Sequence, residues 1–202
     1  MIGGGDGGTA REVLRHKSVK KCVMVEIDKA VVDACVAHIP LTASDLTGNP
    51  RLELKIEDAV KYVEETNERF DVILVDSTDP IGPAAPLFGP EFYDNIKKVL
   101  KSDGIVVSQG ESCWYESKMQ TVLLGLLKDR FEITKIYNFS NLTYPGGLWS
   151  FTYASNKYNP LDFKDSKVEA SGLDFKYYNK EIHKAAFCLP TFMKQKLEQY
   201  LS

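Results

Sequence analysis

The sequence predicts an α/β fold in which a mostly parallel sheet ends in an antiparallel hairpin. Three observations support this. Strand-like apolar runs alternate with helix-like segments along most of the chain. A glycine cluster, Gly3 to Gly8, stands where a first strand would turn into a helix. The last two strand-like segments follow one another with no helix between them, which favours an antiparallel pair.

Each element of this fold has its own sequence signal. Six segments are apolar and bounded by turn residues, which predicts strands at Cys22 to Ile27, Leu52 to Ile56, Val72 to Val75, Ile105 to Ser108, Ile133 to Asn138 and Trp149 to Ala154. Five segments have helical character: Thr9 to Arg15, Lys29 to Ala37, Asp58 to Glu65, Pro90 to Leu100 and Glu116 to Lys128. Beyond Asn156 a polar stretch runs to Lys180, and a short helix is expected from Pro190 to Tyr200.

A strand should precede the glycine cluster, yet only Met1 and Ile2 are available for it. In a doubly wound sheet this first strand is central, so we expect it to be largely missing. The polypeptide is therefore expected either to start upstream of Met1 or to be a truncated product. The closing hairpin is typical of Rossmann-like methyltransferase sheets rather than of dehydrogenases. Residues 1–202 are long enough for one such domain, here interpreted as N-terminally truncated.

Composition excludes several classes of function. The net charge is −3 and the basic residues are dispersed, so no nucleic-acid footprint is present. No run approaches a membrane span or a signal peptide, which favours a cytoplasmic protein. The four cysteines are scattered without a C-x-x-C pair, and the three histidines are far apart. We therefore expect reduced thiols and no metal site.

The glycine cluster predicts a nucleoside site. Glu26 follows Asp6 by twenty residues, at the end of the next expected strand, where an acid can take both ribose hydroxyls. Asp6 stands in the middle of the glycines and departs from the dinucleotide fingerprint. A carboxylate there would repel a pyrophosphate, so NAD and FAD are disfavoured and a cationic ligand group is favoured.

Acids and amides recur at the expected carboxyl ends of the strands, the rim where such sheets bind ligands. They are Asp6, Glu26, Asp28, Asp58, Asp76, Asp79, Gln109 and Glu111. Asp28 and Asp58 could equally be helix caps, because loop acids often are. Acids at every strand end are harder to explain in that way. The pattern favours a site for polycationic small molecules.

Two loops could complete such a site. The segment from Ile81 to Phe88 holds two prolines and a glycine among apolar residues and could be a semi-rigid lid or an ordinary crossover loop. Tyr144 and Trp149 could line a channel for methylene chains and ammonium groups, or could simply belong to the core.

Together these residues resemble the spermidine synthase family of polyamine aminopropyltransferases. The motifs that carry the resemblance are Gly3-Gly4-Gly5-Asp6-Gly7-Gly8, Val25-Glu26-Ile27-Asp28, Asp76-Ser77-Thr78-Asp79-Pro80, Gln109-Gly110-Glu111, Thr143-Tyr144-Pro145-Gly146-Gly147 and Ile182-His183-Lys184-Ala185-Ala186-Phe187. The resemblance covers nearly the whole chain. It implies transfer of an aminopropyl group from decarboxylated S-adenosylmethionine, a co-substrate rather than a resident cofactor, to putrescine. The products would be spermidine and methylthioadenosine.

The resemblance also implies a role for each site residue. Asp76 would be the catalytic base. The donor would be bound by Gly3, Gly5, Asp6, Gly7, Glu26, Asp58, Ala59 and Asp76. The acceptor would be bound by Asp6, Asp79, Gln109, Tyr144 and Trp149, and no metal is implied. Family members carry an N-terminal β-rich domain that this sequence lacks, and a homodimer or larger assembly is expected of the full-length protein.

Two other functions remain open from the residues alone. An S-adenosylmethionine-dependent N-methyltransferase of a small amine would use the same fold and the same ribose acid, although Asp6 argues against the carboxylate of intact S-adenosylmethionine. An inactive, truncated or partner subunit that only binds a nucleoside would suit the short first strand. Putrescine is the acceptor that the resemblance implies, while cadaverine, spermidine or an agmatine-like amine would satisfy the same acids.

Overall fold

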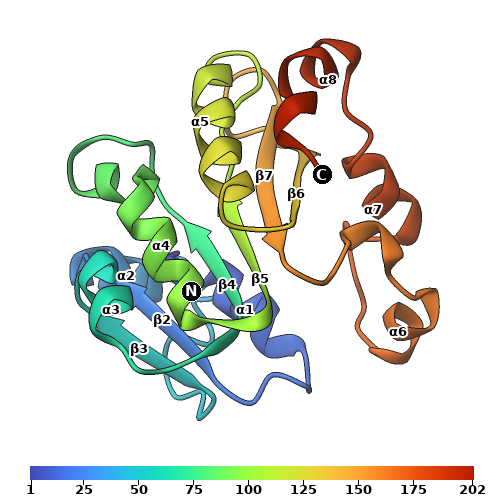
Figure 1. The fold of residues 1–202 in the computed structure, drawn as a ribbon. Helices are drawn as coiled ribbons and strands as arrows, with labels where there is room; N and C mark the ends of the chain where they lie inside the picture. The colour runs from blue at the N-terminus through green and yellow to red at the C-terminus, as the bar shows by residue number, and fades with distance from the viewer. The chain divides into compact units, whose positions relative to one another are not determined.

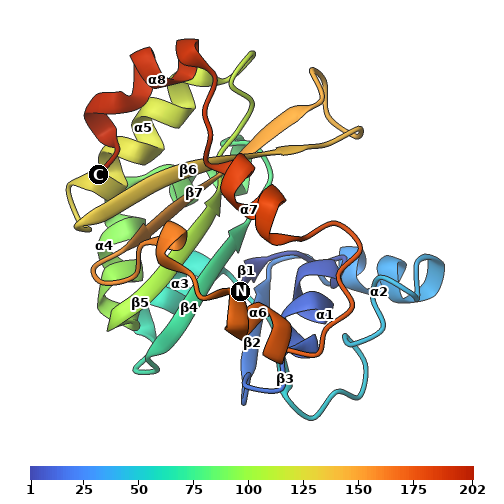
Figure 2. The same ribbon diagram turned by 90° about the vertical axis from the view of Figure 1, so that its right-hand side faces the viewer.

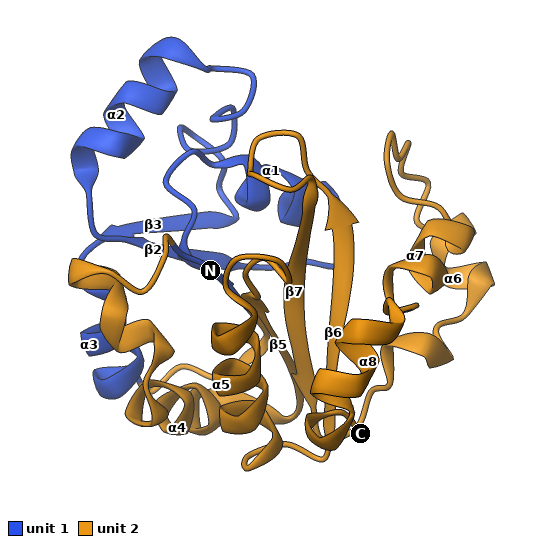
Figure 3. Ribbon diagram, turned by 90° about the horizontal axis from the view of Figure 1, so that it is seen from above, with its two compact units in different colours: residues 1–66, 74–77 blue, residues 67–73, 78–202 orange.

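The computed structural model describes residues 1–202 and contains a seven-stranded mixed sheet (Figure 1). The strands are hydrogen-bonded in the order β3-β2-β1-β4-β5-β7-β6. The chain divides into two compact units, residues 1–66 with 74–77 (unit 1) and residues 67–73 with 78–202 (unit 2), coloured separately in Figure 3. The predicted α/β class and the antiparallel C-terminal strands are confirmed.

Unit 1 is a parallel α/β unit. Its elements are β1 (Ile2–Gly3), α1 (Gly8–Arg15), β2 (Cys22–Glu26), α2 (Lys29–His38), β3 (Leu52–Ile56), α3 (Ala59–Glu65) and the end of β4 (Phe70–Asp76). Ile2 pairs in parallel with both Val25 of β2 and Val75 of β4. Gly3 pairs with Asp76, so the glycine cluster starts beside the carboxyl end of β4.

The core of unit 1 lies under β2. Met24 is fully buried against Ala10 of α1 and Val32 of α2, with Leu46 from the following loop. Burial of such apolar side chains is the main force that holds short helices on a sheet. Arg51 then fixes the end of α1, because its guanidinium donates to the carbonyl oxygens of Leu14, His16 and Val19.

Unit 2 contains the antiparallel end of the sheet. Its elements are η1 (Gly82–Phe88), α4 (Pro90–Val99), β5 (Leu100–Gln109), α5 (Ser117–Lys128), β6 (Ile133–Ser140), β7 (Leu148–Ser155), η2 (Pro160–Asp162), α6 (Asp165–Ala170), α7 (Lys180–Ala186), α8 (Thr191–Leu197) and η3 (Glu198–Tyr200). β7 pairs antiparallel with β5 and β6. Gln109 lies opposite Phe151, and Ser140 lies opposite Leu148 at the hairpin end.

The expected C-terminal helix is α8 followed by η3, and Figure 2 shows it beside α5. Met193 and Leu197 of α8 are buried in one cluster with Leu124 of α5 and Ile136 of β6. The Lys196 ammonium also donates to Ser117 Oγ at 2.6 Å. Packing onto α5 therefore stabilises a helix too short to form by itself.

One expectation about unit 2 needs correction. The stretch that the sequence marks only as polar, up to Lys180, contains η2 and α6 and leads directly into α7, and neither α6 nor α7 was foreseen. Asn179 caps α7, since its side chain accepts from Ile182 N at 2.7 Å.

The candidate lid is mostly the exposed 3₁₀ segment η1. None of the helices combines the length and apolar character that crossing a bilayer requires.

Candidate active site

The glycine cluster of unit 1 brings its backbone directly against the end of β4. Gly3 has φ +72°, and a Cβ placed on it would lie 2.1 Å from the Asp76 carbonyl oxygen. No side chain fits at this distance, and the left-handed backbone disfavours any other residue. Glycine at this position is therefore required by the strand packing as well as by any ligand.

Asp76 is a carboxylate of unit 1 that lies beside the glycine cluster. It is the last residue of β4, is partly buried, and its Oδ2 accepts a hydrogen bond from Thr9 Oγ1 at 2.9 Å. Burial raises the pKa of the Asp76 carboxyl above its usual value, the Thr9 hydrogen bond lowers it, and the nearby Asp6 carboxylate raises it further. The net effect is a raised pKa, as a group that accepts a proton requires.

Asp6 lies within the glycine cluster and is exposed. Its Oδ1 accepts from Gly8 N at 2.8 Å, the first residue of α1. One oxygen thus satisfies a free N–H at the start of the helix. The electrostatic effect of Asp6 on Asp76 shows that the two carboxylates share one region of unit 1.

Glu26 is the last residue of β2 and is only 9% exposed. Its Oε1 accepts from Asp28 N at 3.0 Å. A Cβ placed on Gly5 would lie 3.0 Å from Glu26 Oε2, so a side chain at position 5 would cover this oxygen. The glycine therefore keeps the second carboxylate oxygen of Glu26 accessible from the loop.

Asp28 and Asp58 are helix N-caps, which was the alternative that the sequence left open. Asp28 Oδ1 accepts from Ala30 N, and Asp58 Oδ1 accepts from Val60 N, each at 2.8 Å. Both residues are exposed, and Ala59 follows Asp58 as the first residue of α3. A cap occupies one oxygen and leaves the other for a ligand, so the donor role implied for Asp58 stays a prediction.

Unit 2 contains the expected acceptor residues. Gln109, the last residue of β5, is buried, and its Nε2 donates to Glu111 Oε1 at 2.9 Å. Asp79 is exposed, and its charge acts on Glu111. These three residues therefore lie in one region of unit 2.

Tyr144 and Trp149 stack on each other, with ring centroids 4.4 Å apart. Tyr144 is 49% exposed, so it does not belong to the core. The turn between them packs against Trp114, because a Cβ on Gly146 would lie 2.8 Å from Trp114 Cδ1. The hairpin thus presents aromatic faces, and the channel role expected of them stays a prediction.

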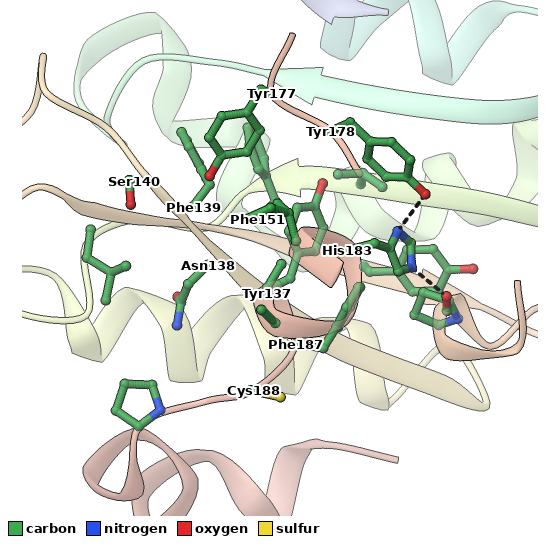
Figure 4. A pocket seen from close by; sticks show the side chains of 18 residues that line it. Tyr137, Asn138, Phe139, Ser140, Phe151, Tyr177, Tyr178, His183, Phe187 and Cys188 are labelled. Atoms are coloured by element: carbon green, nitrogen blue, oxygen red, sulfur yellow. Dashed lines mark hydrogen bonds between the residues drawn. The ribbon is translucent and has the colours of Figure 1, made fainter. Parts of the chain in front are cut away.

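An aromatic pocket of about 720 Å³ in unit 2 was not foreseen (Figure 4). Its wall includes Tyr137 and Phe151, whose ring centroids are 5.5 Å apart. His183 lies at its edge, within hydrogen-bond distance of Tyr178 Oη and the Pro160 carbonyl oxygen, as the dashed lines show. No residue predicted for the donor or the acceptor lines this pocket.

Sequence reasoning missed two further features. Thr9 follows the glycine cluster directly, yet nothing in the sequence pairs it with Asp76, 67 residues away. Glu111 stood on the predicted rim without a role. All four cysteines are free thiols, and no group of three or more His, Cys, Asp or Glu side chains could hold a metal ion.

The fold and these strand-end acids define a Rossmann-like enzyme of the group-transfer type. Residues 1–165 match the spermine/spermidine synthase domain. A polyamine aminopropyltransferase of Thermoanaerobacter sp. (strain X514) is 47% identical over 194 residues, which are 96% of this chain and 69% of that protein. One from Methanocaldococcus jannaschii is 43% identical over 205 residues, covering 100% of this chain and 70% of that protein.

Solved structures agree with these relatives. A spermidine synthase in complex with the transition-state analogue AdoDATO has a TM-score of 0.93 and 40% identity, over 98% of this chain and 68% of that one. The spermidine synthase of Thermotoga maritima has a TM-score of 0.89 and 38% identity, over 98% and 66%. The chain belongs to the spermine/spermidine synthase family and is an aminopropyltransferase by its relatives.

Proposed function

We propose that this chain transfers an aminopropyl group from decarboxylated S-adenosylmethionine to putrescine, with spermidine and methylthioadenosine as products. The observation that carries the proposal is Asp76: a partly buried carboxyl whose pKa is raised, beside the glycine cluster and bonded to Thr9. The family membership supports the reaction type.

The sulfonium of the donor is already a good leaving group. The chemical step therefore mainly needs a base. The amine nitrogen of putrescine attacks the methylene carbon next to the sulfonium. A C–N bond forms, the C–S bond breaks, and its electron pair stays on sulfur as a neutral thioether. The attacking amine must first lose a proton, because amines of pKa ~10 are mostly charged at neutral pH. We assign that proton to Asp76.

The donor residues proposed here are those of unit 1. Glu26 would accept hydrogen bonds from the ribose hydroxyls through the oxygen that Gly5 leaves accessible. Asp6 would attract the ammonium group of the aminopropyl chain. Asp58 and Ala59, at the start of α3, would contact the adenine.

The acceptor residues proposed here are Asp6 and those of unit 2. Asp79 and Gln109 would hold the diamine by charge and by hydrogen bonds. Tyr144 and Trp149 would pack on its methylene groups, which their stacked and partly exposed rings suit. Aromatic faces also attract ammonium groups.

Donor choice follows from the pair of carboxylates in unit 1. Intact S-adenosylmethionine has a carboxylate that would meet Asp6 and Asp76, whereas the decarboxylated donor lacks it. This charge pattern disfavours the methyltransferase alternative. Like charges brought together in a partly buried site can cost several kcal/mol.

We further propose that residues 1–202 act as one Rossmann-like catalytic domain. Four free thiols suit a reducing compartment such as the cytoplasm. A homodimer or larger assembly stays an expectation from the resemblance, and sedimentation velocity measures it directly.

The test is a product analysis of the chain mixed with putrescine and either donor. We expect spermidine and methylthioadenosine in a one-to-one ratio from decarboxylated S-adenosylmethionine and no methylated amine from the intact form. Calorimetry should show tighter binding of the decarboxylated donor. Tighter binding of intact S-adenosylmethionine, with methyl transfer, would overturn the proposal in favour of a methyltransferase.

A further inference from the structure

The two oxygens of the Asp76 carboxylate have different surroundings. Oδ2 accepts from Thr9 Oγ1 at 2.9 Å, and a Cβ placed on Gly4 would lie 3.2 Å from the same oxygen. The backbone of the glycine cluster therefore lies close to the oxygen that Thr9 binds. Oδ1 makes no hydrogen bond within the chain and is not closed off from solvent. The carboxylate thus has one oxygen held by the protein and one left for a ligand.

Thr9 is placed firmly enough to hold that oxygen. It is the second residue of α1, and the next residue, Ala10, is fully buried in the cluster that includes Met24 of β2. Packing therefore fixes the start of the helix against the sheet. Threonine branches at Cβ, which restricts χ1 and with it the direction of the hydroxyl. Toward an ionised carboxylate this hydroxyl donates, because the carboxylate has no proton to give.

The Thr9 bond affects where a proton can be placed on Asp76. A hydroxyl that donates to Oδ2 keeps its bond when the proton arrives on Oδ1, whereas a proton on Oδ2 would compete with it. The bond also opposes the two effects that raise the pKa of Asp76, which are burial and the charge of the Asp6 carboxylate. Without Thr9, the carboxyl would be protonated over a wider range of pH and on either oxygen.

We propose that Thr9 is a positioning residue that directs proton transfer to Oδ1 of Asp76. In this step an N–H bond of the acceptor ammonium breaks, and its electron pair stays on nitrogen as the attacking lone pair. The proton forms an O–H bond with Oδ1. Thr9 neither exchanges a proton nor contacts the substrate. The proposal rests on the proposed function, because it requires Asp76 to be the base.

Thr9→Val tests this role, since valine keeps the shape and the branching of the side chain but lacks the hydroxyl. Single-turnover transfer from decarboxylated S-adenosylmethionine to putrescine, both saturating, is followed as a function of pH. At neutral pH the rate should fall about 10-fold. The rise of the rate with pH should move upward by about one pH unit, as expected for the loss of one hydrogen bond to a charged group. Thr9→Ser restores the hydroxyl, so its rate should stay within about threefold of the parent rate and its profile should not move.

Two controls separate positioning from a general effect on the fold. Thr42→Val removes another hydroxyl beside the glycine cluster, since Thr42 Cγ2 lies 3.2 Å from a Cβ placed on Gly8, but Thr42 makes no bond to Asp76. Its rate and pH profile should match those of the parent chain. Calorimetric affinity for methylthioadenosine should stay within about twofold in all three variants, because the role proposed for Thr9 lies outside nucleoside binding.

A double variant shows whether Thr9 acts through Asp76. Thr9→Val should cost about 10-fold in the parent chain but less than about twofold in Asp76→Asn, because the base that Thr9 positions is already absent. Equal costs in both backgrounds would show that Thr9 acts elsewhere and would overturn the proposal.

The parent chain and Thr9→Val together separate the positioning role from the reaction itself. An unshifted pH profile in Thr9→Val, or a loss of methylthioadenosine affinity that matches the loss of rate, would overturn the role of Thr9 while the proposed function stands. Failure of the unsubstituted chain to convert putrescine would overturn the proposed function, and the role of Thr9 with it.

Discussion

Unit 1 and unit 2 use their carboxylates in different ways. In unit 1, four strand-end acids each accept from the backbone N–H group two residues further along the chain: Asp6, Glu26, Asp28 and Asp58. Asp76, the fifth strand-end acid of unit 1, instead accepts from the hydroxyl of Thr9. In unit 2, Glu111 Oε1 accepts a hydrogen bond from the Gln109 amide, and Glu111 Oε2 has no hydrogen-bond partner.

The difference suggests that the type of partner sorts acids by role. Backbone N–H donors hold these carboxylates in a fixed orientation, and the roles proposed for three of them are all in binding: an ammonium group for Asp6, the ribose for Glu26 and the adenine for Asp58. For Asp76, partial burial and the nearby Asp6 carboxylate raise the pKa, as its proposed role as base requires.

Asp76→Asn should give the largest loss. The variant keeps the shape of the side chain but removes the base, so single-turnover transfer should slow by ~10²-fold to 10⁴-fold. Methylthioadenosine has no amine on its short tail, so its calorimetric affinity should stay within a few fold. Near-normal turnover at saturating substrates would remove Asp76 from the base role and leave Asp79 as the next candidate.

Gly3→Ala should destabilise unit 1 by about 2–5 kcal/mol, which combines the left-handed backbone with a severe clash against the Asp76 carbonyl. Gly48→Ala is the matched control, because Gly48 has φ +81° with no atom within 4 Å of its Cβ position. It should lose only about 1–2 kcal/mol. Urea unfolding followed by circular dichroism measures both, and equal losses would show that the close approach to Asp76 is unimportant.

Glu26→Gln should weaken methylthioadenosine binding about 10-fold to 100-fold, because charge-assisted bonds to the ribose become neutral ones. Transfer at saturating donor should change less than binding does. Glu57→Gln is the control, since Glu57 is exposed and comes directly after Ile56, the residue of β3 that pairs with Glu26. Calorimetric titration gives both affinities; an unaffected Glu26→Gln would mean that the nucleoside is held by other groups.

The pH dependence of stability should show the smallest effect. The folded-state pKa of Asp76 is raised above its usual value of 3.8, so the folded chain favours the protonated form more than the unfolded chain does. The stability that this preference for the protonated carboxyl contributes is fully present below pH 3.8. It is lost as the pH rises through the raised pKa of Asp76. Asp76→Asn lacks this loss, so its stability relative to the parent chain should rise from acid to neutral pH.

Transfer activity should also depend on the ionisation of Asp76, but it should increase over the pH range in which stability decreases. Activity should rise with pH through the raised pKa of Asp76, because the base must be ionised before it can accept a proton. The residual activity of Asp76→Asn should not show that rise. A pH profile of single-turnover rates tests this, and an identical rise in both chains would assign it to another group.

Local patterns predicted those elements whose apolar residues are bounded by clear turn signals. The strand Leu52–Ile56 has the same bounds in the sequence and in the structure. The sequence predicts β5 only from Ile105, but the strand begins at Leu100. Residues Lys101 to Gly104 are charged or small, so they lack the apolar pattern that predicts a strand. α6 and α7 were missed because helices of six and seven residues are too short to show a clear helical period.

The strand ends could be predicted from the sequence, whereas the contacts between them could not. Spacing placed Asp76 and Glu26 at carboxyl ends of strands, which their positions at the ends of β4 and β2 confirm. The Thr9 bond and the unpaired oxygen of Glu111 depend on tertiary packing and on one strained φ value. Their roles in catalysis stay predictions.

The division into two units has an optical consequence. Both tryptophans, Trp114 and Trp149, belong to unit 2, as do all the tyrosines except Tyr62. Intrinsic fluorescence therefore reports almost entirely on the antiparallel half of the chain, while far-ultraviolet dichroism reports on the helices of both halves. A glycine-cluster variant that loosens only unit 1 would leave the emission spectrum unchanged as the dichroism signal falls.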